Sequence, residues 1–123
     1  SELLFMTVTQ LNEYFAGKRR EFTIPIELKD TDFQKSVWMA LKEIPFGEIC
    51  SYKDIAQSIG NPNAVRAVGG ANHNNPIMII IPCHRVVGSN GTLTGYAAGL
   101  DKKEYLLNLE KIRFKSKQTH RIL

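Results

Sequence analysis

The sequence contains little cysteine, no long apolar segment and no internal repeat. Its two cysteines, Cys50 and Cys83, cannot build a disulfide framework. The longest strictly apolar run, from Ile77 to Ile81, is far too short to span a membrane, and the polar residues near the start do not suit a signal peptide. These absences argue against a secreted disulfide-rich protein and against a membrane protein. They favour an intracellular protein whose thiols stay reduced.

Motifs for metals and phosphates are also missing. No CxxC or HxxxH pair accompanies Cys83 and His84, and His73 and His120 stand alone, so we expect no metal site. The glycine-rich stretch 88–99 matches neither GxGxxG nor the GxxxxGK pattern that cradles phosphates. We therefore expect neither a metal nor a cofactor.

What the chain does carry is a modest excess of positive charge. Lys and Arg number 16 against 12 Asp and Glu, and this formal net charge of +4 permits a nucleic-acid partner without requiring one. Part of the excess follows Glu110, where the residues KIRFKSKQTHRIL include no acid. This segment is either a solvated tail or a segment that contacts phosphates.

Hydrophobic spacing predicts a mainly helical α+β domain. Hydrophobic residues make up 43% of the chain, enough for a packed core. The apolar run before Cys83 predicts a short buried strand over residues 77–81 that leads to this cysteine. Basic residues and Pro25 mark residues 18–30 as a connector, which divides the chain into a leading fragment, 1–31, and a main domain, 32–123. Spacing and capping residues predict helices over residues 6–16, 32–44, 52–59, 63–71 and from Asp101 as N-cap to Glu110, with Ser51 and Asp54 as a near capping box for the third.

The third and fourth predicted helices form a helix-turn-helix pattern. The turn between them contains Gly60 and Pro62. The pattern alone is a weak signal, because many small helical domains contain one. Arg66 is the only strong cation of its second helix. Most of the other residues are small, which lets the backbone approach a ligand closely.

Cys83 and His84 provide a thiol and a base side by side. A thiol with an ordinary pKa of ~8.5 is mostly protonated at neutral pH, and an imidazole held by a carboxylate can take its proton. Glu110 is the candidate carboxylate. From composition alone an inert, structural Cys83 remains an equal alternative, a cysteine protease is disfavoured by the short chain, and Cys50 is expected in the core.

One set of motifs resembles a known family. IPCHRVV, with RAVGGA and NNP upstream and GYAAGLDKKEYLLNLE downstream, is similar to the methylated-DNA–protein cysteine methyltransferases, also called alkylguanine-DNA alkyltransferases. The resemblance runs from Phe33 to Glu110. It implies a winged-helix-like DNA-binding domain that repairs DNA by flipping an alkylated guanine out of the duplex. It also implies a suicide enzyme, in which Cys83 keeps the alkyl (methyl) group from the guanine O6 oxygen in one irreversible step.

The resemblance implies a role for each matching residue. His84 accepts the thiol proton through a water and Glu110 orients His84, while Tyr52 helps to protonate the guanine and Asn75 braces the turn before the thiol. Arg66 matches the finger that enters the duplex in place of the flipped base. The resemblance implies that Tyr52 also lies at the DNA. It implies that small residues of the second helix enter the minor groove: Ala64, Ala67, Gly69, Gly70 and Ala71. The pocket for the alkylated base is implied to involve Tyr96, Ala97, Ala98, Val86 and Pro82.

Some features depart from the family pattern. Residues 1–31 resemble only the last helix and linker of the family's N-terminal domain, so we expect a truncated, cut or naturally short form. Ala97 stands where a hydroxyl residue can contact the guanine oxygen, which affects substrate range. The resemblance implies alkylated duplex DNA as the partner and no association with a membrane. It also implies a monomer that lies in the cytoplasm, or in the nucleus of a eukaryote.

Two other functions remain open at this stage. A non-catalytic relative that only binds the alkylguanine lesion would lack the cysteine, so Cys83 argues against it. A helix-turn-helix transcriptional regulator would bind unmodified DNA and take up no alkyl group. Only the repair enzyme predicts stoichiometric transfer.

Overall fold

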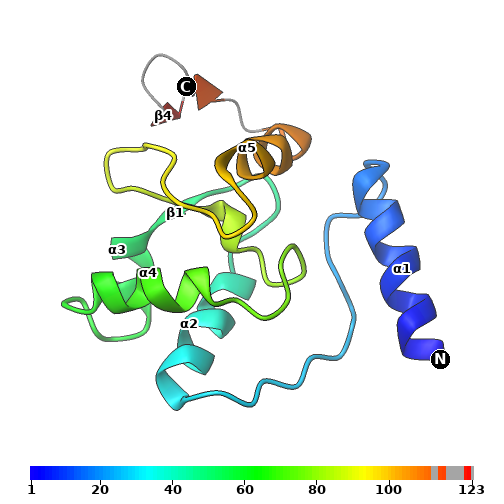
Figure 1. The fold of residues 1–123 in the computed structure, drawn as a ribbon, viewed down its shortest axis with the longest axis horizontal. Coiled ribbons are helices and arrows are strands. Elements are labelled where there is room, and N and C mark those ends of the chain that lie inside the picture. Colours follow the sequence, from blue (N-terminus) through cyan, green and yellow to red (C-terminus); the bar gives the residue numbers. More distant parts are fainter. Residues whose placement is uncertain (112–113, 116–120, 123) are drawn as a thin grey trace.

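The computed structural model describes residues 1–111, 114–115 and 121–122. Figure 1 shows one helix, α1, lying beside a main body that contains all the other elements. The helices are α1 (Glu2–Phe15), α2 (Asp32–Lys42), α3 (Tyr52–Ser58), α4 (Val65–His73) and α5 (Leu100–Leu109), with a 3₁₀ turn, η1, at Cys83–Arg85. The strands are β1 (Cys50–Ser51), β2 (Val86–Val87), β3 (Phe114–Lys115) and β4 (Arg121–Ile122).

The strands are short and form two separate pairs. β1 pairs in parallel with β2, so that Cys50 lies opposite Val86 and Ser51 opposite Val87. β3 pairs with β4 in antiparallel orientation, and the rest of the basic segment after Lys111 lies outside the described residues. The expected fold class, α+β and mainly helical, is confirmed. Among the described residues, no helix combines the length and apolar character needed to cross a bilayer.

The core of the main body lies where α2, α3 and α4 pack together. Val37, Trp38 and Leu41 of α2 are buried, as the amphipathic spacing of this helix predicts. The Trp38 indole N–H donates a 2.8 Å hydrogen bond to the backbone oxygen of Ala71 in α4. This bond satisfies the polar atom of the largest buried side chain and fixes α4 against α2.

The helix-turn-helix pattern is present as two short helices with a tight turn. Ser51 and Asp54 form a complete capping box at the start of α3, as expected. Gly60 follows α3 with φ +78°, a left-handed conformation that glycine adopts without steric cost. The chain can therefore turn sharply into α4, which packs against α3.

The strand expected over residues 77–81 is absent, and this prediction was wrong. The segment folds into tight turns, with hydrogen bonds from the Ile80 amide to the Met78 oxygen and from the Ile81 amide to the Ile77 oxygen. Ile79 has φ +75°, which no regular strand allows. An apolar run becomes a strand only when a neighbouring strand accepts its hydrogen bonds, and here only an isolated bridge joins Met78 to Ile81. The short strand of this region is β2, and it follows Cys83 rather than preceding it.

The two terminal helices differ slightly from expectation. α1 begins at Glu2, four residues before the expected start, because the Ser1 hydroxyl accepts a hydrogen bond from the Leu4 amide and caps it. α5 begins at Leu100 with Gly99 as N-cap, so the expected cap at Asp101 was wrong. Asp101 lies instead in the first turn, where a carboxylate suits the helix dipole.

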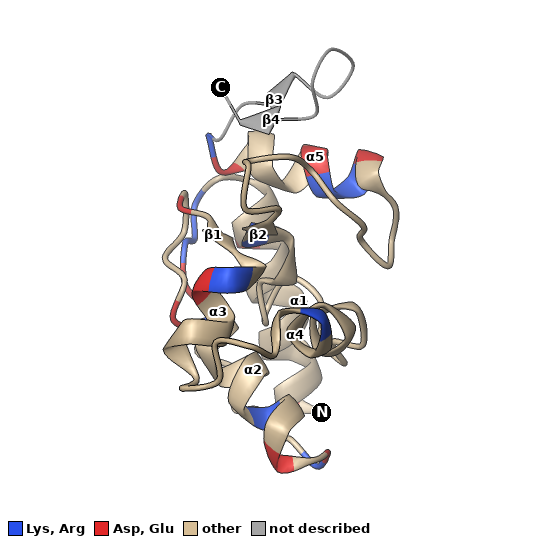
Figure 2. Ribbon diagram, turned by 90° about the vertical axis from the view of Figure 1, so that its left-hand side faces the viewer, with Lys and Arg blue, Asp and Glu red and all other residues tan. Residues whose placement is uncertain are grey.

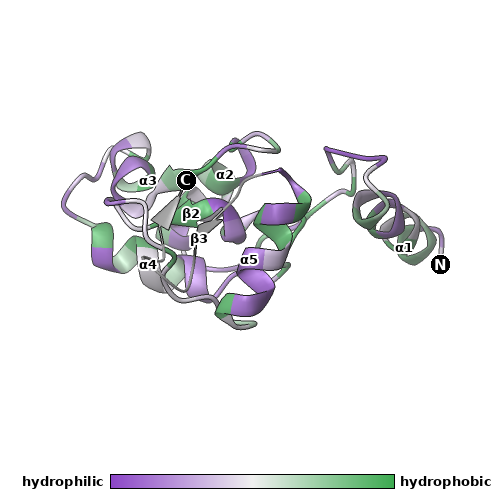
Figure 3. Ribbon diagram, turned by 90° about the horizontal axis from the view of Figure 1, so that it is seen from above, coloured by the Kyte–Doolittle hydropathy of each residue, from purple (hydrophilic) through white to green (hydrophobic). Residues whose placement is uncertain are grey.

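A long extended segment joins α1 to α2 (Figure 1). The side chain of Gln10 in α1 holds this segment at Thr23 through two hydrogen bonds. It donates one to the Thr23 hydroxyl and accepts the other from the Thr23 backbone amide. Figure 3 shows apolar residues along α1. Several apolar side chains of this helix are exposed: Leu3, Leu4, Phe5, Val8 and Phe15. One residue of this helix, Tyr14, is completely buried.

Candidate active site around Cys83

Cys83 begins the 3₁₀ turn η1 and is almost completely buried, with 1% of its surface exposed. A 3₁₀ helix has three residues per turn, so consecutive side chains point about 120° apart. The turn therefore sends the Cys83 thiol in one direction and the side chains of His84 and Arg85 in others. This geometry explains why three adjacent residues can occupy different parts of one site.

Glu110 at the end of α5 is the centre of a buried hydrogen-bond network. Its Oε2 lies 2.7 Å from His84 Nε2 and accepts bonds from the Tyr14 hydroxyl at 2.5 Å and from Arg85 Nη2 at 3.0 Å. Its Oε1 accepts from Arg85 Nε at 2.8 Å and from the Gly47 amide at 3.2 Å. Burial alone would raise the pKa of Glu110, but the bonds from His84 and Arg85 lower it to about 2. The carboxylate is therefore ionised at neutral pH.

His84 is fully buried and holds one defined orientation. Burial lowers the pKa of His84, so the imidazole is neutral at neutral pH. Because Glu110 is an ionised acceptor, Nε2 carries the proton of the neutral ring. Nδ1 is then the unprotonated nitrogen, and it has no hydrogen-bond partner among the described residues. The arrangement leaves His84 with a free basic nitrogen.

The Cys83 thiol is protonated at rest. Burial raises the pKa of Cys83, while hydrogen bonds with the side chains of Asn75 and Tyr96 and the charge of Lys103 oppose this rise. Burial also raises the pKa of Tyr96. The site thus stabilises a thiolate once it forms but needs a base to form it.

Asn75 braces the turn that precedes the thiol. Its Nδ2 donates to the Ile81 oxygen at 2.6 Å, and its Oδ1 accepts from the Ile77 amide at 2.9 Å. Its side chain therefore ties both ends of the 77–81 turns in place of a strand ladder. The residue is buried and also touches Cys83, so it connects loop shape to thiol position.

Tyr52 opens α3 on the other side of the site. Its phenol oxygen accepts a 3.1 Å bond from the Thr94 hydroxyl, and burial raises its pKa. The ammonium group of Lys103 lies 5.9 Å from the Tyr52 ring centre and donates to the Thr94 backbone oxygen at 2.9 Å. Lys103 is fully buried, and burial lowers its pKa to about 8. This lysine anchors the loop that carries Tyr96.

The remaining residues implied for the pocket lie in different environments. Ala97 and Ala98 are exposed on the loop before α5, whereas Tyr96 is buried against Cys83. Val86 is fully buried in the core, and Pro82 is also buried. Pro82 borders a groove of about 930 Å³ between the connector and the end of α2.

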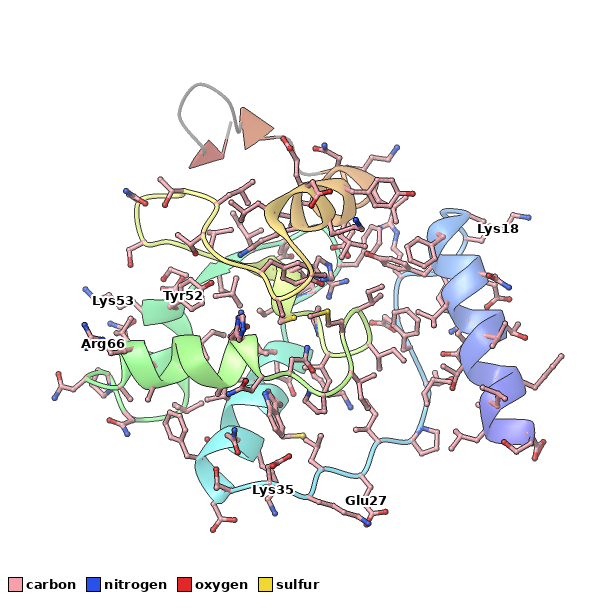
Figure 4. The ribbon with its side chains drawn as sticks, viewed as in Figure 1. Lys18, Glu27, Lys35, Tyr52, Lys53 and Arg66 are labelled. Carbon is pink, nitrogen blue, oxygen red and sulfur yellow. The ribbon has the colours of Figure 1, made fainter. Side chains whose placement is uncertain are left out.

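The small residues implied to meet DNA lie mainly on the outside of α4. Arg66, Ala67 and Gly70 are exposed, and Ala64 and Gly69 are half-buried. Figure 4 shows Tyr52, Lys53 and Arg66 at the same end of the molecule, on α3 and at the start of α4. Arg66 is the only Lys or Arg between Val65 and His73, and Figure 2 shows a blue stretch on the α4 ribbon.

Ala71 does not belong to this outer surface, which corrects the expectation from the sequence. It is 4% exposed, because it faces α2 and its backbone oxygen binds Trp38. Its small side chain allows close helix packing instead of contact with a ligand.

Three residues of the site were missed by reasoning from sequence. Arg85 stands inside the IPCHRVV motif, which was a signal for it. Lys103 lies seven residues before Glu110 and therefore on the same face of α5. Tyr14 is 96 residues from Glu110, and no local sequence pattern predicts their contact. Within residues 1–111, where side chains are described, no group of His, Cys, Asp and Glu could hold a metal ion.

Comparison with protein families places this site in a known context. The sequence model for the DNA-binding domain of 6-O-methylguanine DNA methyltransferase matches residues 32–112, and the model for the ribonuclease-like domain of the same enzyme matches residues 2–28. Methylated-DNA–protein-cysteine methyltransferase of Methanosarcina barkeri is 64% identical over 102 residues, which cover 83% of this chain and 65% of that protein. The constitutive enzyme of the same name from Bacillus subtilis is 54% identical over 109 residues, covering 88% and 66%.

Solved structures agree with this relationship. The Mycobacterium tuberculosis OGT in complex with DNA has a TM-score of 0.85 and 57% identity, covering 86% of this chain and 66% of that chain. S. pombe Atl1, in complex with damaged DNA containing O6-carboxymethylguanine, has a TM-score of 0.65 and 31% identity, covering 78% and 93%. The chain spans about two thirds of the length of the curated relatives that it matches. It belongs to the 6-O-methylguanine DNA methyltransferase family.

Proposed function

We propose that this protein repairs DNA by transferring an alkyl group, typically methyl, from the O6 oxygen of guanine in duplex DNA to Cys83. The observation that carries the proposal is the buried Cys83 thiol beside an oriented His84–Glu110 pair, in a chain of this family. The alkylated cysteine is a stable thioether, so each molecule acts once. The enzyme class is methylated-DNA–protein-cysteine S-methyltransferase.

The first chemical step is removal of the thiol proton. His84 Nδ1 is the base, because Glu110 holds the other ring nitrogen in its protonated form. The proton passes from Cys83 to Nδ1 through a water, as the family resemblance implies. The ionised Glu110 then stabilises the imidazolium that forms, as the carboxylate does in serine protease triads.

Alkyl transfer is then a single displacement at carbon. The thiolate sulfur forms a bond to the alkyl carbon as the bond from that carbon to guanine O6 breaks. The electron pair of the broken bond stays on guanine, which takes up one proton from Tyr52. The Tyr52 phenolate then regains a proton from the His84 imidazolium by way of solvent. The proton lost by Cys83 thus equals the proton gained by guanine, and the products are a thioether and an ordinary guanine.

The DNA partner is proposed to bind along the outer face of α4. This helix presents Ala67 and Gly70 to the outside, and such small residues suit the close approach of a helix backbone to a narrow minor groove. Arg66 at its exposed start enters the stack in place of the flipped base. Tyr52 then acts at the mouth of the pocket, and Asn75 acts behind the thiol. The exposed Ala97 and Ala98 close over the base.

The chain organisation is also part of the proposal. We assign residues 1–31 to the helix and linker of the family's N-terminal domain and residues 32–123 to the catalytic and DNA-binding domain. The match of the ribonuclease-like domain to residues 2–28 supports this division. A monomer suits a reaction that consumes one protein per lesion. A chromosomal substrate places the protein in the cytoplasm of a prokaryote or the nucleus of a eukaryote.

The test is the intact mass of the protein after incubation with a duplex that contains one O6-methylguanine. We expect the mass gain of one methyl group, located on Cys83 by peptide analysis and absent in Cys83→Ala. Cys50→Ala is the matched control and should gain the same mass. Tight binding to the lesion without a mass gain would favour a lesion-binding protein, and no preference for the lesion would favour a transcriptional regulator.

A further inference from the structure

The N-terminal helix contributes a side chain to the network around the catalytic base. Tyr14 lies in the last turn of α1, and its hydroxyl donates a 2.5 Å hydrogen bond to Glu110 Oε2. The same oxygen accepts the hydrogen bond from His84 Nε2, and the distance between these two atoms is 2.7 Å. The contact joins a helix outside the main body directly to the carboxylate that orients His84 (Figure 1).

The packing around Tyr14 leaves its hydroxyl little freedom. The ring is fully buried and contacts three other aromatic rings, those of Phe15, Phe22 and Phe46, at centroid distances of 5.4, 5.6 and 6.1 Å. Phe22 belongs to the connector, and Phe46 follows α2. Rings on several sides fix the position of the hydroxyl oxygen beside Glu110, so this hydrogen bond is built into the fold.

We propose that Tyr14 is a positioning residue that sets the orientation and strength of the Glu110–His84 hydrogen bond. Glu110 Oε2 accepts from Tyr14, His84 and Arg85 together, so each donor restricts where the other two can bind. Removing Tyr14 takes away one of the three donors to Oε2 and loosens the carboxylate on the side that faces His84. It also leaves more negative charge on the oxygen that faces His84.

The expected direction of the effect follows from the groups around Glu110. They are Tyr14 from α1, the Gly47 amide from the turn after α2, and His84 and Arg85 from η1, while Lys103 of α5 acts on His84 through its charge. Burial and the bond to Glu110 raise the pKa of Tyr14, so it remains a donor across the working pH range. Loss of this donor makes Glu110 a stronger acceptor, which raises the pKa of His84.

The test compares wild type with Tyr14→Phe, which removes only the hydroxyl. The control is Tyr105→Phe, which removes a hydroxyl from a tyrosine that is 56% exposed on α5. The first readout is proton NMR of the His84 Nε2–H, which does not depend on DNA. We expect its resonance to move downfield and its titration to move to higher pH in Tyr14→Phe, with no change in Tyr105→Phe.

The second readout rests on the proposed function. The single-turnover rate of methyl transfer should fall about tenfold in Tyr14→Phe, in line with one hydrogen bond. The acid limb of the rate profile should move to higher pH. A purely structural role would lower the unfolding midpoint but leave both the His84 resonance and the acid limb unchanged, and that result would overturn the inference.

A second variant covers the case in which Tyr14→Phe does not fold. Placing 3-fluorotyrosine at position 14 keeps the hydroxyl and makes it a stronger donor, so the His84 resonance should move upfield. An unchanged resonance would overturn the inference. Failure of wild type to take up methyl would count against the proposed function alone, because the NMR readout decides the role of Tyr14 independently.

Discussion

Arg85 holds Glu110 through two hydrogen bonds, from Nε to Oε1 at 2.8 Å and from Nη2 to Oε2 at 3.0 Å. Its third nitrogen, Nη1, donates to the Ile44 backbone oxygen at 2.7 Å, so the guanidinium is fixed at both ends. The geometry is the bidentate pairing that only arginine provides. It makes Arg85 the main partner of a buried charge.

Arg85→Met should therefore destabilise the fold strongly. The variant leaves Glu110 buried without its cation, and breaking a buried pair in this way costs on the order of 3 kcal/mol of unfolding free energy. Urea unfolding measures this loss. Arg66→Met is the control, because Arg66 is exposed, and it should change stability by no more than about 0.5 kcal/mol. Equal effects of the two substitutions would contradict this role for Arg85.

Acid should destabilise the protein in two steps. Burial lowers the pKa of His84, so below about pH 6.5 the unfolded chain binds a proton that the folded chain does not, and the free energy of unfolding falls. The pKa of Glu110 is about 2 in the fold, so its contribution is present above about pH 4.3 and is lost as the pH falls towards 2. Urea midpoints between neutral pH and pH 2 measure both steps. In Glu110→Gln the second step should disappear, and an unchanged slope there would contradict the assignment.

Thr94→Val should slow alkyl transfer without unfolding the protein. Burial raises the pKa of Tyr52, and the hydrogen bond that the Thr94 hydroxyl donates to the Tyr52 oxygen opposes this rise. Loss of that bond makes Tyr52 a weaker acid for the protonation of guanine that we propose. The single-turnover rate should fall several-fold. Thr92→Val is the matched control, because the Thr92 hydroxyl bonds only to Asn90 in the same loop among the hydrogen bonds of the described residues. A rate equal to that of the control would exclude this role for Thr94.

The parts of the fold that sequence reasoning predicts well depend on neighbouring residues. The capping box of α3 is formed by Ser51 and Asp54, three residues apart, and the apolar stripe of α2 repeats over one helix. Cys83 and His84 are adjacent, so their common location needed no tertiary information. Such short-range patterns carry their own physical cause, which is hydrogen bonding within one turn or burial of one face.

The parts that could not be predicted depend on distant partners. The run from Ile77 to Ile81 has the composition of a strand, but its backbone is organised by Asn75 and not by a neighbouring strand. Tyr14 reaches Glu110 across almost the whole chain, and only the packing of α1 against the end of α5 brings them together. Ala71 was expected to face DNA because small residues suit both a narrow groove and close helix packing.

Gly70→Ala separates the stability of α4 from its proposed contact with DNA. A methyl group at this position meets no atom within 4 Å apart from the neighbouring residues and backbone of its own helix, and alanine is a better helix former than glycine by about 0.5–1 kcal/mol. We therefore expect Gly70→Ala to fold at least as stably as wild type. If α4 lies against the minor groove, the same methyl group contacts the DNA and weakens binding.

Fluorescence anisotropy with a lesion-containing duplex measures the effect on binding. Kd should rise about tenfold, while its salt dependence stays the same because no charge is removed. Asn12→Ala is the control: it also improves helix propensity, on an exposed position of α1, and it should leave Kd unchanged. An unchanged Kd in Gly70→Ala would show that the α4 backbone does not approach DNA closely at this residue. The small residues of α4 would then need another explanation, such as the close packing against α2 that already accounts for Ala71.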